Sequence, residues 1–320
     1  MQVQGRAVMV TGGGGFLGTH LVARFRRAGA DVTAPRSADY DLTRPEDTRS
    51  AFERFRPAVV VHAAAAVGGI GYNRLYPADI FRNNLTMSCN VLEACRGHGV
   101  EKVVIIGSAC AYPGDVTGTL NEADFLAGPM HASVECYGFS KRALYLGARA
   151  YREQYGLDSI FLVLTNLYGP HDKFDPEESH VVAALVRKFV EAADRGDPAV
   201  DCWGTGAPIR EFLYAPDCAE AVVRAAERYD APEPLNVGTG TGTSIKELAE
   251  MLARITGFEG KVKWDASKPD GAMRKVLDVS RMNEALNWVP PTSLEDGLRA
   301  TVEWYRTNYP QTGATGAGET

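Results

Sequence analysis

Short apolar runs alternate with segments of helical periodicity along the first half of the chain. The apolar runs, rich in β-branched residues, predict strands at 7–11, 31–34, 58–63 and 102–108, and the periodic segments predict helices at 20–28, 44–55 and 78–98. This βαβαβαβ order is typical of a parallel sheet covered by helices on both faces. Right-handed crossovers then favour an α/β fold, a Rossmann doubly wound sheet that binds its ligands at the carboxyl ends of the strands.

The pattern changes after the middle of the chain. A helix at 135–155 and a strand at 159–164 continue the sheet, but long loops follow from Tyr168, with helices at 180–193 and 245–256. Ser244 and Glu247 have the spacing of a capping box at the start of the last helix. We therefore expect a Rossmann domain at 1–166, completed by parts of 205–240, and a smaller, interleaved substrate-binding domain at 167–310. Residues 311–320 have no apolar anchor, which predicts a disordered tail.

The composition is that of a globular protein with a full core. Of 320 residues 45% are hydrophobic, and the net charge of -6 argues against a nucleic-acid-binding surface, which needs a clustered excess of Lys and Arg. The six cysteines show no Cys-x-x-Cys pair and follow no secretory leader, so we expect a reducing cytoplasm, with neither disulfides nor a metal site. The apolar run at 58–70 is interrupted by His62 and is shorter than the roughly 20 residues that span a bilayer, so no membrane segment is predicted.

A glycine-rich turn, Thr11-Gly12-Gly13-Gly14-Gly15-Phe16-Leu17-Gly18, directly follows the first strand. The spacing of Gly12, Gly15 and Gly18 lets the backbone turn tightly and approach a pyrophosphate, which would sit on the free N–H groups of the next helix. Structural turns also use glycine, but a position between a first strand and a first helix favours dinucleotide binding. We therefore predict a nicotinamide cofactor at this turn.

The residues after the second strand favour NADP(H) over NAD(H). An NAD site usually has an acid at the end of that strand to bind the ribose 2′-hydroxyl, and none occurs at 32–35. Arg36 follows instead, and its guanidinium suits a 2′-phosphate, although a solvated surface arginine is the alternative. The small side chains of Ala63, Ala64 and Ala65, after the third strand, would let the backbone approach the cofactor; a packed strand end explains them nearly as well.

Tyr137 and Lys141 lie four residues apart in a helical segment, which puts both side chains on one face. A nearby ammonium favours phenolate, so Lys141 is expected to lower the pKa of Tyr137. Ser108 ends the preceding strand, where its hydroxyl can meet the same substrate oxygen. Tyr-x-x-x-Lys is common by chance, but together with the glycine turn these residues predict hydride transfer at a carbonyl or alcohol carbon.

With these motifs the chain resembles the extended short-chain dehydrogenases/reductases. Within that group it is similar to the GDP-L-fucose synthases over nearly its whole length, up to about Tyr305. The segments that carry this similarity are AAAVGGI at 64–70, YPAD at 76–79, GSACAYP at 107–113, TNLYGP at 165–170, SHVV at 179–182, WGTG at 203–206, REFL at 210–213 and KPDG at 268–271.

The resemblance implies a two-stage reaction on GDP-4-keto-6-deoxy-D-mannose: epimerisation at C3 and C5, then reduction of the C4 ketone by NADPH. It assigns the acid/base pair to Cys110 and His180, although a small core cysteine and a satisfied surface histidine are the ordinary explanations of such residues. It implies GDP-sugar contacts at Asn166, Lys188, Trp203, Arg210, Arg274 and Asp278. It extends the cofactor contacts to Phe16, Leu17, Asp41, Leu42, Asn166, His180, Tyr137 and Lys141. Loop packing would also explain Trp203, and pairing with Glu211 would explain Arg210.

The chain departs from the fucose synthases beside the expected sugar pocket. Before Tyr137 it reads HASVEC at 131–136, where those enzymes typically have Pro-Thr-Asn-Glu-Pro, and Ala109 replaces a second serine. A related nucleotide sugar, such as another deoxyhexose or a heptose, therefore stays open.

Two other functions also stay open. One is an NDP-sugar epimerase that keeps its nicotinamide tightly bound and shows no net redox change. The other is a non-catalytic, nucleotide-sensing Rossmann protein. By resemblance, the helices at 78–98 and 135–155 are expected to pair in a homodimer.

Overall fold

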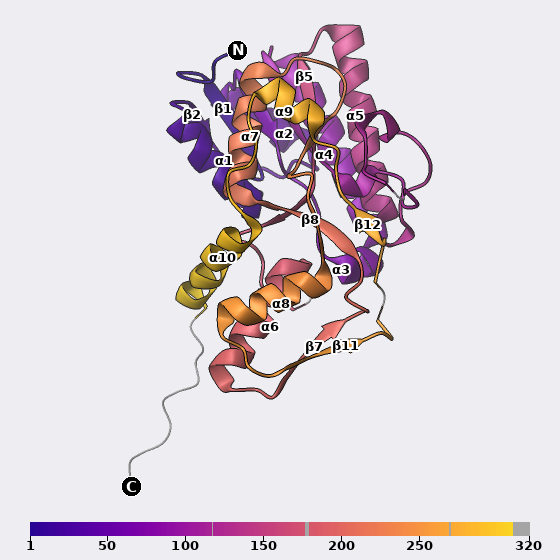
Figure 1. Cartoon of the computed structure of the whole chain (residues 1–320). Helices are drawn as coiled ribbons and strands as arrows, with labels where there is room; N and C mark the ends of the chain where they lie inside the picture. The colour runs from indigo at the N-terminus through magenta and orange to yellow at the C-terminus, as the bar shows by residue number, and fades with distance from the viewer. Residues whose placement is uncertain (117, 177–178, 269, 310–320) are drawn as a thin grey trace.

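Six parallel strands form the central sheet of the computed structural model, which describes residues 1–116, 118–176, 179–268 and 270–309 (Figure 1). They are β1 (Ala7–Thr11), β2 (Asp31–Thr33), β3 (Val59–His62), β4 (Lys102–Ser108), β5 (Ser159–Leu164) and β9 (Leu235–Val237), in the order β2-β1-β3-β4-β5-β9. From β1 the chain adds β2 on one side and then returns to place β3 on the other. The carboxyl ends of β1 and β3 therefore border a topological switch point, where sheets of this kind bind their ligands.

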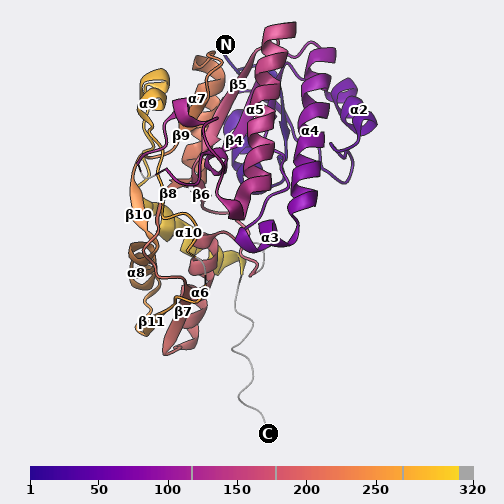
Figure 2. The same cartoon turned by 90° about the vertical axis from the view of Figure 1, so that its right-hand side faces the viewer.

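Helices cover both faces of the sheet (Figure 2). One face packs against α1 (Phe16–Arg27), α7 (Ala215–Arg228) and α9 (Ser280–Leu286), and the other against α2 (Pro45–Phe55), α4 (Pro77–Gly97) and α5 (Glu135–Tyr155). Side chains alternate between the two cores: in β1, Val8 and Val10 pack on the α1 side and Met9 on the α4 side. Because both faces are buried, the strands are apolar throughout, which is why short apolar runs predicted them. The structure confirms the predicted α/β Rossmann fold.

The second half of the chain adds a smaller layer at the carboxyl end of the sheet (Figures 1 and 2). The strand β8 (Ile209–Tyr214) pairs with three others, β6 (Asn166–Tyr168), β10 (Gly242–Ser244) and β12 (Arg274–Lys275). A separate two-stranded sheet consists of β7 (Ala199–Trp203) and β11 (Lys261–Asp265). The helices α6 (Val181–Arg195), α8 (Ile245–Thr256) and α10 (Leu294–Asn308) share a third apolar core. Since β6 begins directly after β5, this layer lies next to the edge where ligands are expected.

Most elements predicted from the pattern occur at or near their predicted bounds. α5, β5 and α8 have the predicted limits, and Ser244 forms the capping box with Glu247. The pattern missed α3 (Ile70–Leu75), α7, α9, α10 and the short strands after β5. The buried face of α7 consists largely of alanine, including Ala219 and Ala225, and such small side chains give a weak hydrophobic signal. The predicted tail at 311–320 lies outside the described residues.

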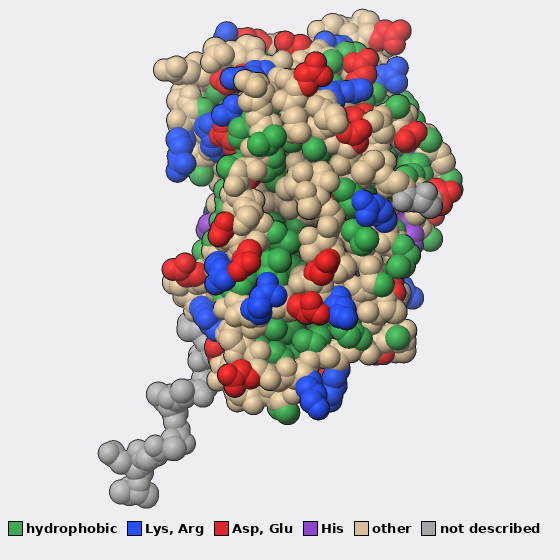
Figure 3. Space-filling view, viewed as in Figure 1, with side chains coloured by type: hydrophobic (Ala, Val, Ile, Leu, Met, Phe, Trp, Pro, Cys, Tyr) green, Lys and Arg blue, Asp and Glu red, His purple; other side chains and the backbone are tan. Residues whose placement is uncertain are grey.

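Charges of both signs are interspersed over the face shown in Figure 3. With a net charge of -6, this face has no one-signed basic surface of the kind that nucleic acids select. Among the helices in the described ranges, none combines the length and the apolar character needed to cross a bilayer.

The capping box gives a test of the smaller layer. Replacing Ser244 by alanine is expected to lower the free energy of unfolding by about 1 kcal/mol, because the backbone N–H of Glu247 loses its 3.1 Å bond to the Ser244 hydroxyl. Urea unfolding followed by circular dichroism measures the change. The control is Ser50→Ala, since the Ser50 hydroxyl is exposed inside α2 and bonds the Glu46 carbonyl of its own helix. Equal stability of Ser244→Ala and wild type would contradict a stabilising cap.

Candidate active site

The glycine turn between β1 and α1 is pressed against the end of β3. Gly12 has a left-handed φ of +70°, and a Cβ there would lie 2.8 Å from the backbone of Ala64. A Cβ on Gly18 would lie 2.0 Å from the Gly12 carbonyl oxygen. Gly15 caps α1 without a side-chain hydrogen bond, so the first N–H groups of that helix are available to an anion. The turn therefore fits a dinucleotide pyrophosphate.

Behind the turn, the buried His62 joins the ends of β1 and β3. Its Nδ1 lies 2.9 Å from the Thr11 hydroxyl, which also accepts a hydrogen bond from the Ala64 N–H at 3.3 Å. The Thr11 hydroxyl thereby links the His62 ring on β3 to the backbone that follows this strand. Burial, and then the charge of Lys141, lower the pKa of His62 to about 3, so the ring is neutral. The sequence analysis missed that His62 joins the ends of β1 and β3. The available signal was a polar residue inside an otherwise apolar strand.

Arg36 lies near the same turn. A Cβ on Gly13 would lie 2.6 Å from the side chain of Ala34, so the chain leaving β2 packs directly against the turn. Arg36 follows two residues later, exposed, and pairs with Asp39 at 3.0 Å. An exposed ion pair is weak, so the guanidinium can exchange this carboxylate for a phosphate at little cost.

The other expected cofactor residues surround the turn. Phe16 and Leu17 are half-buried in the first turn of α1, and Leu42 is buried. Asp41 is exposed, and hydrogen bonds from the backbone and side chain of Thr43 lower its pKa. The remaining predicted residues, Ala63, Ala64 and Ala65, are half-buried directly after β3. Contact of these residues with a cofactor stays a prediction.

Ser108, Tyr137 and Lys141 meet at the end of β4. Ser108 is the last residue of that strand, and its hydroxyl is near enough to the Tyr137 phenol to lower the pKa of that group. Tyr137 and Lys141 are both buried on the face of α5 that packs against the sheet. The Lys141 Nζ donates to the Ile106 carbonyl at 2.9 Å and lies 5.7 Å from the centre of the Tyr137 ring. The structure thus brings together the three residues that the sequence predicted as one constellation.

The expected electrostatic effect of Lys141 on Tyr137 was wrong. Burial raises the pKa of Tyr137 well above its usual value, the charge of Cys110 adds to this rise, and the hydrogen bond with Ser108 opposes it. The Lys141 ammonium is directed at the Ile106 carbonyl, and burial lowers its own pKa to about 8. The phenol is therefore protonated at neutral pH, which suits a proton donor better than a base.

Cys110 and His180, the expected acid/base pair, lie in different surroundings. The Cys110 N–H donates to the Ser108 hydroxyl at 3.2 Å, and its Sγ accepts a hydrogen bond from Lys275 at 3.7 Å. His180 precedes the first residue of α6, with an extended backbone and an exposed side chain. Desolvation by the surrounding protein lowers the pKa of His180, and the charge of Lys173 adds to this, although part of the ring remains accessible. His180 is therefore neutral at neutral pH.

Cations and an indole gather on β7, β8 and β12. Arg210 on β8 is half-buried, which lowers its pKa, and donates to the carbonyls of Ile209 at 2.9 Å and Asp270 at 3.4 Å. Trp203 ends β7 with 66% of its surface exposed, and the ammonium of Lys268 lies 5.6 Å from its ring. Such an exposed indole, backed by a cation, has the surface of a ligand platform rather than of a core residue.

Two more predicted residues extend this set. Arg274 on β12 is in register with Ile209 of β8, and the Lys188 Nζ donates to the Asp201 carbonyl on β7 at 2.7 Å. Both cations thus lie on elements that border Trp203 and Arg210. Several positive charges on one side of the site suit a diphosphate.

Two predicted ligand residues are already engaged in structural bonds. One oxygen of Asp278 accepts from the backbone and side chain of Ser280, and the other accepts from Asn121 at 3.0 Å. The Asn166 amide donates to the carbonyl of Glu211 at 2.9 Å. The Glu211 carboxylate is fully buried among backbone N–H groups, so the alternative in which Arg210 pairs with Glu211 is wrong.

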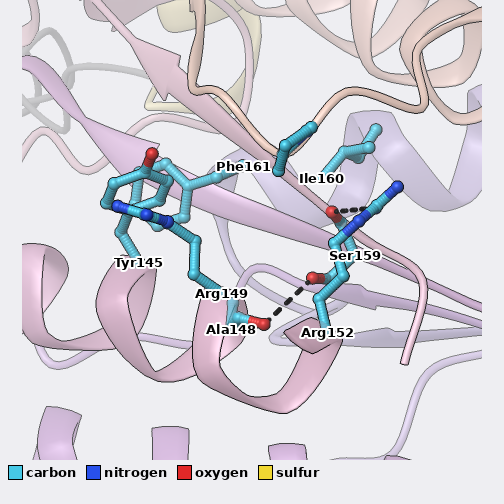
Figure 4. A pocket seen from close by; sticks show the side chains of 8 residues that line it. Tyr145, Ala148, Arg149, Arg152, Ser159, Ile160 and Phe161 are labelled. Atoms are coloured by element: carbon cyan, nitrogen blue, oxygen red, sulfur yellow. Dashed lines mark hydrogen bonds between the residues drawn. The ribbon is translucent and has the colours of Figure 1, made fainter. Parts of the chain in front are cut away.

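A small cavity in the same helix–sheet layer lies away from these groups (Figure 4). It lies between the later turns of α5, at Tyr145 and Arg152, and the start of β5. There Arg152 donates to the Ser159 carbonyl and the Ser159 hydroxyl donates to the Ala148 carbonyl. Its volume of about 10 Å³ is roughly that of one water molecule, so it does not hold a substrate.

Comparisons with known proteins agree with this geometry. The model of the NAD dependent epimerase/dehydratase family matches residues 8–238. The chain is 42% identical to GDP-L-fucose synthase 1 of Arabidopsis thaliana over 302 residues, which cover 94% of this chain and 93% of that protein. It is 37% identical to GDP-L-fucose synthase of Escherichia coli, covering 94% of this chain and 97% of that protein.

Solved structures are similar over the same extent. A GDP-L-fucose synthetase from Naegleria fowleri bound to NADP has a TM-score of 0.88 at 27% identity, covering 96% of each chain. A GDP-6-OMe-4-keto-L-xylo-heptose reductase from Campylobacter jejuni has a TM-score of 0.89 at 28% identity, covering 96% of this chain and 99% of that one. Both likenesses extend through the Rossmann sheet and the smaller layer.

The glycine turn generates a binding test. Gly18→Ala is expected to weaken NADPH binding by roughly tenfold or more, about 1.4 kcal/mol, because its Cβ would lie 2.0 Å from the Gly12 carbonyl oxygen. Titration of NADPH fluorescence measures the affinity, and circular dichroism checks the fold. Gly97→Ala at the end of α4 is the control, since a Cβ there meets nothing within 4 Å. Wild-type affinity in Gly18→Ala would exclude the turn as the pyrophosphate site.

Proposed function

Since this chain belongs to the NAD dependent epimerase/dehydratase family, we propose that it is an NADPH-dependent enzyme that epimerises and then reduces a GDP-4-keto sugar. The preferred substrate is GDP-4-keto-6-deoxy-D-mannose, converted to GDP-L-fucose, because the similar plant and bacterial proteins are named GDP-L-fucose synthases. The observation that carries the proposal is the meeting of Ser108, Tyr137 and Cys110 at the end of β4, beside a turn that fits a dinucleotide.

The reduction uses the residues of the Rossmann sheet. When bound, the nicotinamide supplies the hydride for the ketone carbon. Tyr137 gives its phenolic proton to the ketone oxygen, and burial keeps that proton in place until it is needed. Ser108 hydrogen-bonds the phenol and orients it toward the same oxygen. Lys141, anchored on the Ile106 carbonyl, holds its ammonium beneath the Tyr137 ring.

The epimerisation uses a base and an acid on opposite sides of the sugar. Hydrogens on the carbons next to the ketone are acidic because the ketone oxygen takes up the charge. Cys110 removes such a hydrogen as a proton, the C–H electron pair forms an enolate, and Ser108 and Tyr137 stabilise its oxygen by hydrogen bonds. His180, on the smaller layer, takes up a proton from water and passes it to the other face of the carbon, which inverts that carbon and leaves the ring neutral again.

The sugar itself depends on the segment that departs from the fucose synthases. The His131 ring bonds the Ser133 hydroxyl at 2.8 Å, and a Cβ on Gly114 would lie 2.6 Å from the His131 backbone, so the segment packs against the chain that follows Cys110. A heptose substrate is the second candidate, because the similar Campylobacter jejuni protein is named a heptose reductase. Mass spectrometry with NADPH oxidation, across a panel of GDP-4-keto deoxyhexoses and heptoses, decides between them; no turnover of either class would overturn the proposal.

The other functions have weaker support. An epimerase without net redox change is supported by likeness to solved structures such as UDP-glucose 4-epimerase of Thermotoga maritima, at 27% identity and a TM-score of 0.83. Stoichiometric NADPH consumption would exclude it. A nucleotide-sensing protein would have no use for Ser108, Tyr137 and a buried Lys141 together, and burial of the Lys141 ammonium costs stability.

The proposal includes a homodimer in the cytoplasm. Phe81 on α4 and Phe139 on α5 are 39% and 49% exposed with ring centres 6.0 Å apart, and Leu146 adds another exposed apolar side chain on α5. Two neighbouring helices that expose apolar side chains support pairing with a second copy across this face.

Tyr137→Phe tests the reduction. This variant should slow hydride transfer by roughly 10²-fold or more, because the ketone oxygen loses its proton donor. Single-turnover NADPH oxidation measures the rate, and NADPH titration should show nearly unchanged binding. Tyr155→Phe is the control, since Tyr155 lies at the far end of α5 and is 49% exposed. Wild-type turnover in Tyr137→Phe would remove the phenol from the mechanism.

Cys110→Ser and His180→Gln test the epimerisation. Each should lower solvent deuterium incorporation at C3 and C5 by roughly 10²-fold, since a positioned acid or base contributes about that factor. Mass spectrometry of the recovered sugar measures the incorporation. NADPH affinity should stay nearly intact, and an equal loss of cofactor binding would contradict the acid/base roles. The matched control is Cys89→Ser, because Cys89 is an exposed thiol on α4.

A further inference from the structure

A lysine of the smaller layer reaches the thiol at the end of β4. Lys275 is the last residue of β12, and its Nζ lies 3.7 Å from the Cys110 Sγ, although the two residues are 165 positions apart. Within residues 1–116, 118–176, 179–268 and 270–309, no carboxylate pairs with this ammonium and the sulfur is its one hydrogen-bond acceptor. Ion pairs elsewhere on this chain, such as Arg82 with Asp79, join a cation to a carboxylate, whereas the half-buried Lys275 has a sulfur atom as its partner.

The backbone holds Lys275 in this place. β12 runs parallel to β8, with Lys275 in register with Arg210. The N–H of Leu277, two residues on, donates to the buried carboxylate of Glu211 at 2.7 Å, and Leu120 donates to the Val276 carbonyl at 2.8 Å. The pairing with β8 and these two bonds, within two residues of Lys275, hold its backbone beside the end of β4.

Three ionisable groups face the Cys110 sulfur. Lys275 comes from β12, Arg210 from β8 and Tyr137 from α5. Arg210 also faces Asp270, and the hydrogen bonds of its guanidinium go to two backbone carbonyls and not to the sulfur. Tyr137 is protonated and has no charge to offer. Lys275 is therefore the group whose charge is directed at the sulfur.

We propose that Lys275 is a positioning residue that holds the Cys110 sulfur as a thiolate, ready to take a proton from the carbon beside the sugar ketone. The inference rests on the proposed function and adds a residue to its epimerisation half. In the step, the proton moves from carbon to sulfur, the C–H electron pair enters the enolate, and the ammonium keeps all its protons. A cation beside a thiol favours the nucleophilic, basic thiolate form.

Alkylation of the thiol tests the inference without any sugar. The full-length protein is treated with iodoacetamide from pH 6 to 10, and peptide mass spectrometry follows Cys110 separately from the other five thiols. In Lys275→Met the midpoint of Cys110 alkylation should move upward by roughly one pH unit or more, and in Lys275→Arg it should stay near wild type. The control is Lys263→Met, an exposed lysine on β11. An unchanged midpoint in a folded Lys275→Met would overturn the proposal.

Deuterium exchange links the thiolate to the reaction. With NADPH withheld, Lys275→Met should incorporate solvent deuterium beside the ketone roughly tenfold more slowly at neutral pH, and the deficit should shrink at high pH, where the thiol ionises without help. Lys275→Arg should restore most of the rate. A loss that is the same at every pH would indicate a structural role instead.

The outcomes separate this inference from the proposed function. If the wild type neither exchanges deuterium nor oxidises NADPH with any GDP-4-keto sugar, the proposed function fails, whatever Lys275 does to the thiol. If the wild type is active and Lys275→Met matches it in alkylation and exchange, the function stands and the role of Lys275 fails.

Discussion

The buried carboxylate of Glu211 is the interaction on which the two-layer arrangement depends. The two carboxylate oxygens accept hydrogen bonds from the N–H groups of Thr239, Gly240 and Leu277. The backbone carbonyl of Glu211 accepts one from the Asn166 amide. Burial raises its pKa, and these N–H donors oppose that rise, so the carboxylate is tolerated in the interior because its bonds are satisfied. One side chain thereby joins β8, the exit of β9 and β12, and a two-layer site becomes possible.

The two layers contribute different electrostatics to one site. On the Rossmann side, burial keeps Tyr137 protonated, the state that a proton donor needs. On the other side, Lys275 directs its ammonium at the Cys110 sulfur, the condition that the proposed thiolate base needs. Groups with opposite tasks can act a few ångströms apart when their environments favour opposite protonation states. In the proposed mechanism the smaller layer thus supplies part of the acid/base chemistry as well as the expected contacts to the nucleotide.

Much of this site could be predicted from residues that are close in sequence. The glycines from Gly12 to Gly18, and the pair Tyr137 and Lys141, follow local rules of turn geometry and helix spacing. Lys275 obeys no such rule, because its partner is 165 positions away and no motif marks it. The expected effect of Lys141 on the phenol also failed, because helix spacing says that two side chains share a face but not where an ammonium points; here it points to the Ile106 carbonyl.

By itself, the sequence determined the Rossmann half: both faces of its sheet are buried, so each strand had to be an apolar run and each helix a periodic one. It also determined the dinucleotide turn, since a side chain at Gly12 or Gly18 would collide with backbone. Only the tertiary structure decided the strands of the smaller layer, which are as short as β12 at Arg274–Lys275 and gain their stability from partners distant in the chain. It alone decided the charges around Cys110, because burial and long-range neighbours, which set ionisation, exist only in the folded molecule.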